Sequence, residues 1–137
     1  MTGTKRISVQ DVMKTDYGTI SGQATITEAL EEMKRLQTAV LVVDKKSEHD
    51  EYGLILVSHI ARQVLAKDKA PGRMNVYEIM TKPAVCVDPD MDIRYCTRLF
   101  DKFGLSYAPV IDNGELKGVV SYASMVLRGL CRDARES

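Results

Sequence analysis

The 137-residue chain contains no tryptophan, and only 6% of its residues are aromatic. It also lacks an excess of either charge, since 19 basic residues balance 19 acidic ones. Such a neutral chain has no basic stripe of the kind that nucleic-acid binders carry. No apolar run approaches the roughly 18 residues that cross a bilayer, and the beginning, MTGTKRISVQ, lacks the apolar stretch of a signal peptide. We therefore expect a cytoplasmic protein with no nucleic-acid partner and no membrane span.

Motifs for catalysis and for metal binding are also absent. The sequence has no HExxH, no GxxxxGK[ST] and no CxxC, and it contains two histidines, so it predicts neither an enzyme nor a required cofactor. The loop from Asp44 to Tyr52 places His49 beside Asp50 and Glu51. A solvated turn is the favoured interpretation of this loop, and a metal site is the alternative. We predict no metal site.

Three cysteines are spread over the second half of the chain, at positions 86, 96 and 131. Their odd number, and the absence of a nearby histidine cluster, argue against a disulfide framework or a zinc site. We predict that they are buried thiols. A redox switch is the alternative, and it needs an exposed thiolate with a low pKa.

The chain contains an internal repeat. Val9-Gln10-Asp11-Val12-Met13 recurs in kind 67 residues later as Val76-Tyr77-Glu78-Ile79-Met80. With the same offset, Ile26 falls on Ile93 and Met33 falls on Phe100, so apolar positions superpose along both copies. At 45% hydrophobic residues, the chain is able to bury a substantial core.

The first copy shows a helix followed by two strands. Thr25 and Glu28 form a capping box, which predicts a helix from Ile26 to about Leu36. The apolar run 39–43 predicts a strand buried on both faces, and the run 53–57 predicts its partner strand. A second helix is predicted from Ser58, and the polar segment 67–75, which contains Pro71-Gly72, is predicted to connect the copies.

The second copy repeats this order. A short helix to Met80 and a brief strand at 85–87 come first, followed by a helix at 93–103 with Asp92 as N-cap and Gly104 as C-terminal glycine. The runs 108–111 and 116–120 flank Asn113-Gly114, a pair that favours a type I′ turn, so they predict a β-hairpin. A last helix is predicted over 124–130.

Two copies of short helix, strand, helix, strand, strand, helix resemble a tandem pair of cystathionine-β-synthase (CBS) domains, a Bateman module of the stand-alone bacterial or archaeal type. The residues that carry the resemblance are Asp11-Val12-Met13, Glu78-Ile79-Met80-Thr81-Lys82-Pro83, Ala108-Pro109-Val110-Ile111-Asp112, Gly53 and Gly118. The resemblance implies an α+β fold with two pseudo-symmetric repeats, residues 7–66 and 76–131, whose small sheets face each other with the helices outside. It also implies a homodimer.

The resemblance further implies a non-enzymatic regulatory module. Such modules bind AMP, ADP, ATP, NAD or S-adenosylmethionine in clefts between the repeats, hold the ribose with a Gly-x-x-Ser/Thr-x-x-Asp pattern, and act on a partner protein that the sequence does not identify. Here Gly118 leads to Ser121 and then to Ser124 in place of the acid, whereas Gly53 leads to Leu56 and His59. Because both carboxylates are missing, a ligand-free scaffold for protein interaction or dimerisation is the alternative function.

Two candidate ligand sites follow from the resemblance. The favoured site contains Tyr17, Gly18, Ile20, Thr38, Ala39, Ser121 and Ser124. The second site contains Met80, Ala84, Val85, Leu105, Ser106, Ala108, Ser58 and His59. A structural interpretation stands beside each polar candidate, because serine and histidine at the start of a helix also serve as capping residues.

Overall fold

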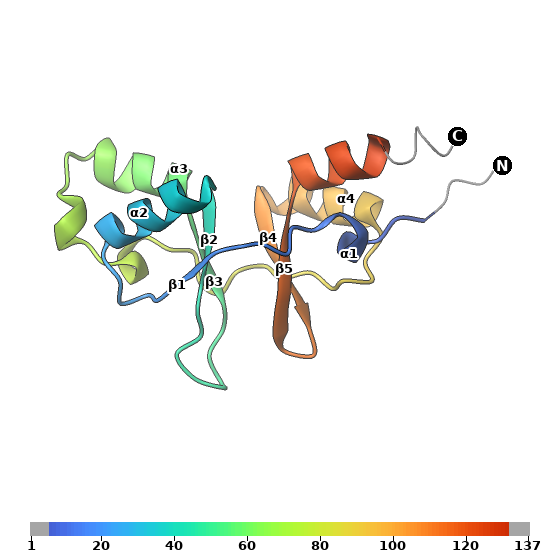
Figure 1. Cartoon of the computed structure of the whole chain (residues 1–137), viewed down its shortest axis with the longest axis horizontal. Coiled ribbons are helices and arrows are strands. Elements are labelled where there is room, and N and C mark those ends of the chain that lie inside the picture. Colours follow the sequence, from blue (N-terminus) through green and yellow to red (C-terminus); the bar gives the residue numbers. More distant parts are fainter. Residues whose placement is uncertain (1–5, 132–137) are drawn as a thin grey trace. The chain divides into compact units, whose positions relative to one another are not determined.

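The computed structural model describes residues 6–131, which form two compact units (Figure 1). One unit is Tyr17–Ala84. The other combines the segment that ends at Asp16 with the chain from Val85 onward. The leading helix of the first copy therefore belongs to the unit that holds the rest of the second copy, and the leading turn of the second copy belongs to the unit of the first. The repeat boundaries 7–66 and 76–131 stay a prediction.

The unit Tyr17–Ala84 contains a three-stranded sheet of order β1-β2-β3. β1 (Thr19–Ile20) runs parallel to β2 (Val40–Val43), which pairs antiparallel with β3 (Gly53–Leu56). The helical segments of this unit are α2 (Ile26–Leu36), α3 (Val57–Ile60), the wider π-type turns η1 (Ala61–Leu65), and two 3₁₀ turns, η2 (Pro71–Arg73) and η3 (Val76–Glu78). All four residues of β2 are buried, as predicted for an uninterrupted apolar strand.

Helix α2 begins and ends where its sequence predicts. The Thr25 hydroxyl accepts a hydrogen bond from the Glu28 N–H (3.2 Å), and the Glu28 carboxylate accepts one from the Thr25 N–H (3.3 Å). Gln37 ends the helix in the left-handed region (φ 53°). The buried face of α2 packs into a core formed by Ile26, Ala29, Met33, Leu41, Val43, Ile55, Ile60, Val64 and Val76.

The second unit contains the predicted hairpin. β4 (Tyr107–Asp112) pairs antiparallel with β5 (Glu115–Ser121), and both turn residues have positive φ, 51° at Asn113 and 80° at Gly114, as a type I′ turn requires. The helices are α1 (Val9–Val12), α4 (Ile93–Phe103) and η4 (Ser124–Leu130), the last with π-type turns. Gly104 follows α4 with φ 65°, which confirms the predicted C-terminal glycine.

Helix α1 is built into this second unit through its backbone and its core residues. The Val9 N–H donates to the Met91 carbonyl (2.8 Å), and the Gln10 N–H donates to the Pro89 carbonyl (3.0 Å). Val9 and Val12 are fully buried in a core that also contains Ile7, Val87, Ile93, Cys96, Phe100, Ala108, Val110, Val120 and Met125. The second unit therefore needs residues that precede Asp16 in the chain.

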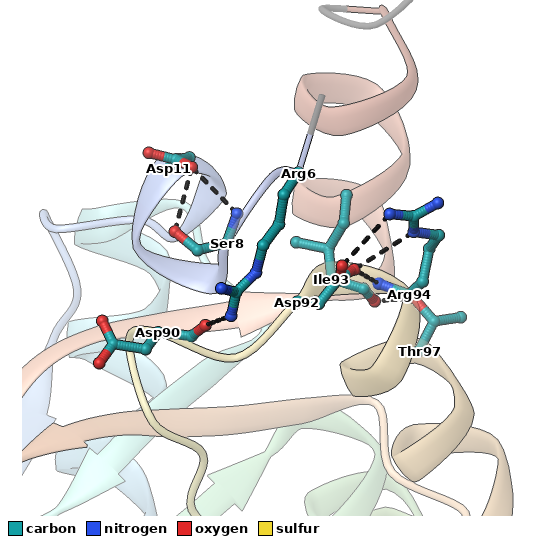
Figure 2. Close-up of polar contacts among 8 residues, drawn as sticks. All are labelled: Arg6, Ser8, Asp11, Asp90, Asp92, Ile93, Arg94 and Thr97. Carbon is teal, nitrogen blue, oxygen red and sulfur yellow. Dashed lines mark hydrogen bonds and ion pairs between the residues drawn. The ribbon is translucent and has the colours of Figure 1, made fainter. Parts of the chain in front are cut away.

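Polar contacts at the starts of α1 and α4 also hold α1 in the second unit (Figure 2). The Arg6 guanidinium donates to the Asp90 carbonyl, and the Asp11 carboxylate accepts from the Ser8 N–H and hydroxyl (both 3.0 Å). The Asp92 carboxylate caps α4 by accepting from the Arg94 N–H (2.8 Å). This confirms the predicted N-cap.

The backbone segment that follows each leading helix or turn pairs with the last strand of its unit. Lys14 and Val119 exchange two backbone hydrogen bonds (2.9 and 3.0 Å), and Thr81 and Leu54 exchange two of 2.9 Å. A Cβ atom at Gly118 would lie 2.7 Å from the Lys14 carbonyl oxygen, and one at Gly53 would lie 2.9 Å from that of Thr81. Glycine is needed at both positions because the neighbouring backbone passes too close for a side chain.

Two predictions are wrong. Residues 85–87 form no strand, because only Val87 pairs with β4, through a single parallel bridge to Val110, before Asp88 starts a turn and Pro89 lacks an N–H. Among the cysteines only Cys96 is buried; Cys86 and Cys131 are exposed. Cys86 lies in the segment that forms no strand, where the next residue, Val87, enters the core instead.

Within residues 6–131, no helix has the length and apolar character that a bilayer crossing requires.

Candidate functional site

Two hydroxyls meet at the end of β5. The Ser121 and Ser124 Oγ atoms lie 3.1 Å apart, and the Ser124 N–H donates to Ser121 Oγ (3.1 Å). Ser124 is 6% exposed, and Ser121 is half-buried. Ser121 therefore caps the following helix, and since the two hydroxyls share one contact, one hydroxyl proton of the pair is left to donate.

The ring of Tyr122 helps to hold this turn in place. It packs edge-on against Phe100, with ring centroids 5.2 Å apart and an interplanar angle of 72°. Phe100 is fully buried, whereas Tyr122 is 39% exposed. The aromatic pair anchors the end of β5 to the core and leaves part of the Tyr122 ring accessible.

The other five residues of the favoured site lie in the unit Tyr17–Ala84. Gly18 and Ile20 accept backbone hydrogen bonds from the N–H groups of Val42 (3.0 Å) and Asp44 (2.9 Å) along the β1–β2 pair. Gly18 is enclosed, because a Cβ atom there would lie 2.3 Å from Leu36 Cδ1.

Thr38 and Ala39 lie just before β2. The Thr38 hydroxyl donates to the Val40 carbonyl (3.2 Å) and accepts from the Val40 N–H (3.3 Å), and the Ala39 carbonyl accepts from the Val57 N–H (2.9 Å). Ala39 is exposed, and Thr38 and Tyr17 are half-buried. The favoured candidates therefore form two groups. Five of them lie around β1 and β2 in one unit, and the pair Ser121–Ser124 lies in the other.

Ile20 also lines an open groove on the face of α2. The remaining lining residues are Glu28, Glu31, Glu32 and Arg35. Arg35 Nε lies 2.6 Å from Glu32 Oε1, and this contact raises the pKa of Arg35 and lowers the pKa of Glu32. Because three carboxylates line the groove and its cation is already paired, the groove does not suit a phosphate group.

The second set of candidates is likewise divided between the units. Ser58, His59, Met80 and Ala84 belong to the unit Tyr17–Ala84, where Ser58 is exposed and Met80 packs against the core. The others are Val85, Leu105, Ser106 and Ala108. In their unit Val85 is 40% exposed and Ser106 is exposed, Leu105 packs against the core, and Ala108 is fully buried.

His59 has structural partners on both ring nitrogens. Its Nδ1 accepts the Leu56 N–H (3.1 Å), and its Nε2 lies 3.4 Å from Thr81 Oγ1. Burial, and then the charge of Arg62, lower the pKa of His59 below its usual 6.5. The histidine therefore takes the role that Glu28 has in the capping box of α2. This agrees with the capping interpretation of the sequence.

The CBS domain family matches two stretches of the chain, residues 9–65 and 76–128. This chain belongs to the CBS domain family. Its two matched stretches form a CBS domain pair, and the observed mixture of small sheets and several helices is the fold of such pairs.

Three relatives illustrate the similarity. The structure of a hexameric CBS-CP12 protein from bloom-forming cyanobacteria superposes with a TM-score of 0.88 at 34% identity, covering 90% of this chain and 68% of that one. The CBS domain pair of protein MJ0100, solved in complex with 5-methylthioadenosine and S-adenosyl-L-methionine, superposes with a TM-score of 0.78 at 22% identity, covering 90% and 95%. The protein MK0525 of Methanopyrus kandleri is 28% identical over 119 residues; the match covers 85% of this chain but 60% of that protein's length.

Thr81, which lies beside His59, is a polar residue that the sequence did not suggest as a candidate. Its hydroxyl faces His59, and its backbone pairs with Leu54. The available signal was its place directly after Met80 in the leading motif of the second CBS repeat. The pairing of that motif with β3 is a long-range contact, which sequence periodicity does not reveal.

The charged loop 44–52 of the first CBS repeat is held by one ion pair. The Asp50 carboxylate lies 2.6 Å from Lys82 Nζ and accepts from the Lys46 N–H (2.7 Å), and both contacts hold the pKa of Asp50 far below its usual value. Lys45 Nζ lies 5.1 Å from the centroid of the Tyr52 ring. Within residues 6–131, no three His, Cys, Asp or Glu side chains gather as a metal site would require.

Proposed function

We propose that this CBS domain pair is a non-enzymatic regulatory module that binds an adenosine-containing ligand such as AMP, ADP, ATP, NAD or S-adenosylmethionine. The observation that carries the proposal is the hydroxyl pair Ser121–Ser124, whose two residues match, by resemblance, the Ser/Thr and Asp positions of the family's ribose pattern. The adenosyl ligands of the related MJ0100 pair support the choice of ligand class. Ligand binding acts by favouring one packing arrangement of the module, which a partner protein senses.

The expected affinity is modest because the acceptor at the ribose position is neutral. A hydrogen bond to a charged group contributes about 1.5 to 3 kcal/mol, whereas a neutral one contributes about 1 kcal/mol. The difference is about 0.5 to 2 kcal/mol, and 1.4 kcal/mol corresponds to a factor of ten in affinity, so Ser124 in place of an aspartate weakens ribose capture by about two- to thirtyfold. Ser124 is also buried and bonded to Ser121, so Ser121 is the more accessible of the two hydroxyls.

A thermal-shift and calorimetric screen of the five adenosyl compounds tests the proposal. A compound present at 100 times its Kd stabilises the fold by about 2.7 kcal/mol, so a bound compound raises the melting temperature. The variant Ser121→Ala removes the accessible hydroxyl and weakens binding if the favoured site is used, whereas Ser58→Ala does so if the second site is used. Ser47→Ala, in the charged loop, is the matched control and leaves binding unchanged. The proposal fails if all five compounds leave the melting temperature unmoved at millimolar concentration.

The second candidate function is a ligand-free scaffold for protein interaction or homodimerisation. The specific observation in its favour is that Ser121 and Ser124 hydrogen-bond to each other, while His59 is bonded to Leu56. The same screen, combined with the mass measured by sedimentation velocity, separates the two functions. A scaffold forms a dimer whose mass and stability do not respond to nucleotides, and its Ser121→Ala variant, which loses a helix cap, still dimerises like the parent.

A further inference from the structure

His59 joins two segments that are distant in the sequence. Its Nδ1 accepts the backbone N–H of Leu56 at the end of β3, and its Nε2 lies 3.4 Å from the Thr81 hydroxyl in the segment after η3. The backbone of Thr81 pairs in both directions with Leu54 in β3 (2.9 Å each). One imidazole therefore connects the start of α3, the end of β3 and the segment 81–84.

This arrangement requires a neutral ring. A ring nitrogen that accepts a hydrogen bond carries no proton, so the single proton of neutral His59 is on Nε2, where it points to the Thr81 hydroxyl. Protonation would place N–H groups at both positions, and the new Nδ1–H would face the Leu56 N–H, donor against donor. The cap of α3 is therefore incompatible with the imidazolium form. The imidazolium keeps its Nε2 proton, so protonation acts through Nδ1: the ring turns away from the Leu56 N–H, and this movement also separates Nε2 from Thr81.

We propose that His59 is a pH-sensitive latch, which in its neutral form holds residues 81–84 against β3 and which releases them when the ring is protonated.

The surrounding groups favour the neutral form at neutral pH. Arg62, on the same helical run, is the charged group that acts on the ring, and Thr81 on the facing segment carries no charge. The ammonium group of the next residue, Lys82, is paired with Asp50 at 2.6 Å. Burial and Arg62 both lower the pKa of His59 from 6.5. Because the unfolded chain binds this proton more readily, the stability that His59 contributes is fully present above about pH 6.5 and is lost as the pH falls through the lower folded value.

The other unit contains an internal control. Lys14 and Val119 exchange two backbone hydrogen bonds in the same way, but the helix that follows β5 is capped by the Ser121 hydroxyl. Serine does not titrate in this pH range. A mild drop in pH should therefore loosen the Leu54–Thr81 pair and leave the Lys14–Val119 pair unaffected.

The latch also bears on ligand binding. The segment next to Thr81 contains Met80 and Ala84, two residues of the second candidate site, so acid should weaken a ligand held there; this consequence rests on the proposed function. The latch itself is tested on protein without ligand. Failure of the latch and failure of ligand binding are therefore distinguishable.

The first experiment compares urea unfolding of the parent, His59→Asn and His49→Asn at pH 7.5 and 5.5. The asparagine Oδ1 can accept the Leu56 N–H and does not titrate, and His49, the other histidine of the chain, is exposed in the loop 44–52. The parent and His49→Asn should lose stability at pH 5.5, by up to about tenfold in the folded-to-unfolded ratio, because pH 5.5 lies about one unit below the ordinary histidine pKa. The loss should be smaller in His59→Asn. An equal loss in all three proteins would refute the latch.

The second experiment needs no substitution. Backbone amide exchange measured by NMR at pH 7.5 and 5.5, corrected for intrinsic exchange rates, should show lower protection of Leu56 and Thr81 at the lower pH. Protection of Lys14 and Val119 should not change. If Leu56 and Thr81 keep their protection after the His59 ring has titrated, the proposal is wrong.

Discussion

Replacing Gly118 with alanine should disturb the backbone pairing between the segment after α1 and strand β5. The new Cβ would lie 2.7 Å from the Lys14 carbonyl oxygen and 2.8 Å from Met13 Sδ. The methionine side chain is able to move, but the backbone oxygen takes part in the paired hydrogen bonds between Lys14 and Val119. The chain after α1 must therefore shift away from β5.

The expected cost follows from two overlapping effects. Overpacking a site that has no room costs about 1 to 3 kcal/mol, and each backbone hydrogen bond contributes about 1 kcal/mol. Alanine regains up to about 1 kcal/mol, because it reduces the freedom of the unfolded chain. The net loss should be about 2 kcal/mol. For a chain of this size that corresponds to a fall of about 6 °C in the melting temperature.

Thermal unfolding followed by circular dichroism measures this change against two related variants. Gly53→Ala should lose a similar amount, since its Cβ would lie 2.9 Å from the Thr81 carbonyl oxygen. Gly72→Ala is the control, because its nearest neighbour, Thr27 Oγ1, is 3.7 Å away and its φ is not positive, so it should keep or slightly gain stability. If Gly118→Ala melts within about 1 °C of Gly72→Ala, close backbone approach is not the reason for glycine at this position.

Two further predictions concern the thiols and the folding units. At pH 8 a thiol reagent should modify the exposed Cys86 and Cys131 first, because Cys96 is buried and burial raises its pKa to about 11; equal rates for all three by mass spectrometry would contradict the assigned burial. The fragment 17–84 should unfold cooperatively in urea, whereas the fragment 7–66 should not, since it lacks the fully buried Val76. A cooperative transition in 7–66 alone would show that the exchanged turn η3 is dispensable.

Local signals in the sequence predicted the regular elements well. The Thr25–Glu28 box, the Asp92 cap and the Asn113-Gly114 turn each depend on residues within a few positions of one another, so sequence spacing was sufficient. The strand predicted at 85–87 failed because pairing there depends on β4, more than 20 residues away. The prediction that Cys86 is buried was wrong for the same reason.

The candidate site was predicted only in part. The motif after each glycine located Ser121, Ser124 and His59, but the sequence left open whether these side chains cap helices or meet a ligand. In the structure Ser121 caps the Ser124 N–H and His59 caps the Leu56 N–H, and Thr81 lies beside His59. No periodic pattern predicts that contact, since it joins residues 22 positions apart through tertiary packing.

The sequence by itself determined that the chain is a repeated α+β module, because the apolar period and the capping residues act locally in each copy. It also determined the CBS family, because the motifs recur in the same order. Only the tertiary structure decided that α1 is built into the core of the second copy and η3 into the core of the first. It alone also explains Gly53 and Gly118. Both facts depend on backbone segments meeting across long sequence separations, where complementary packing and paired hydrogen bonds, rather than local preference, set the outcome.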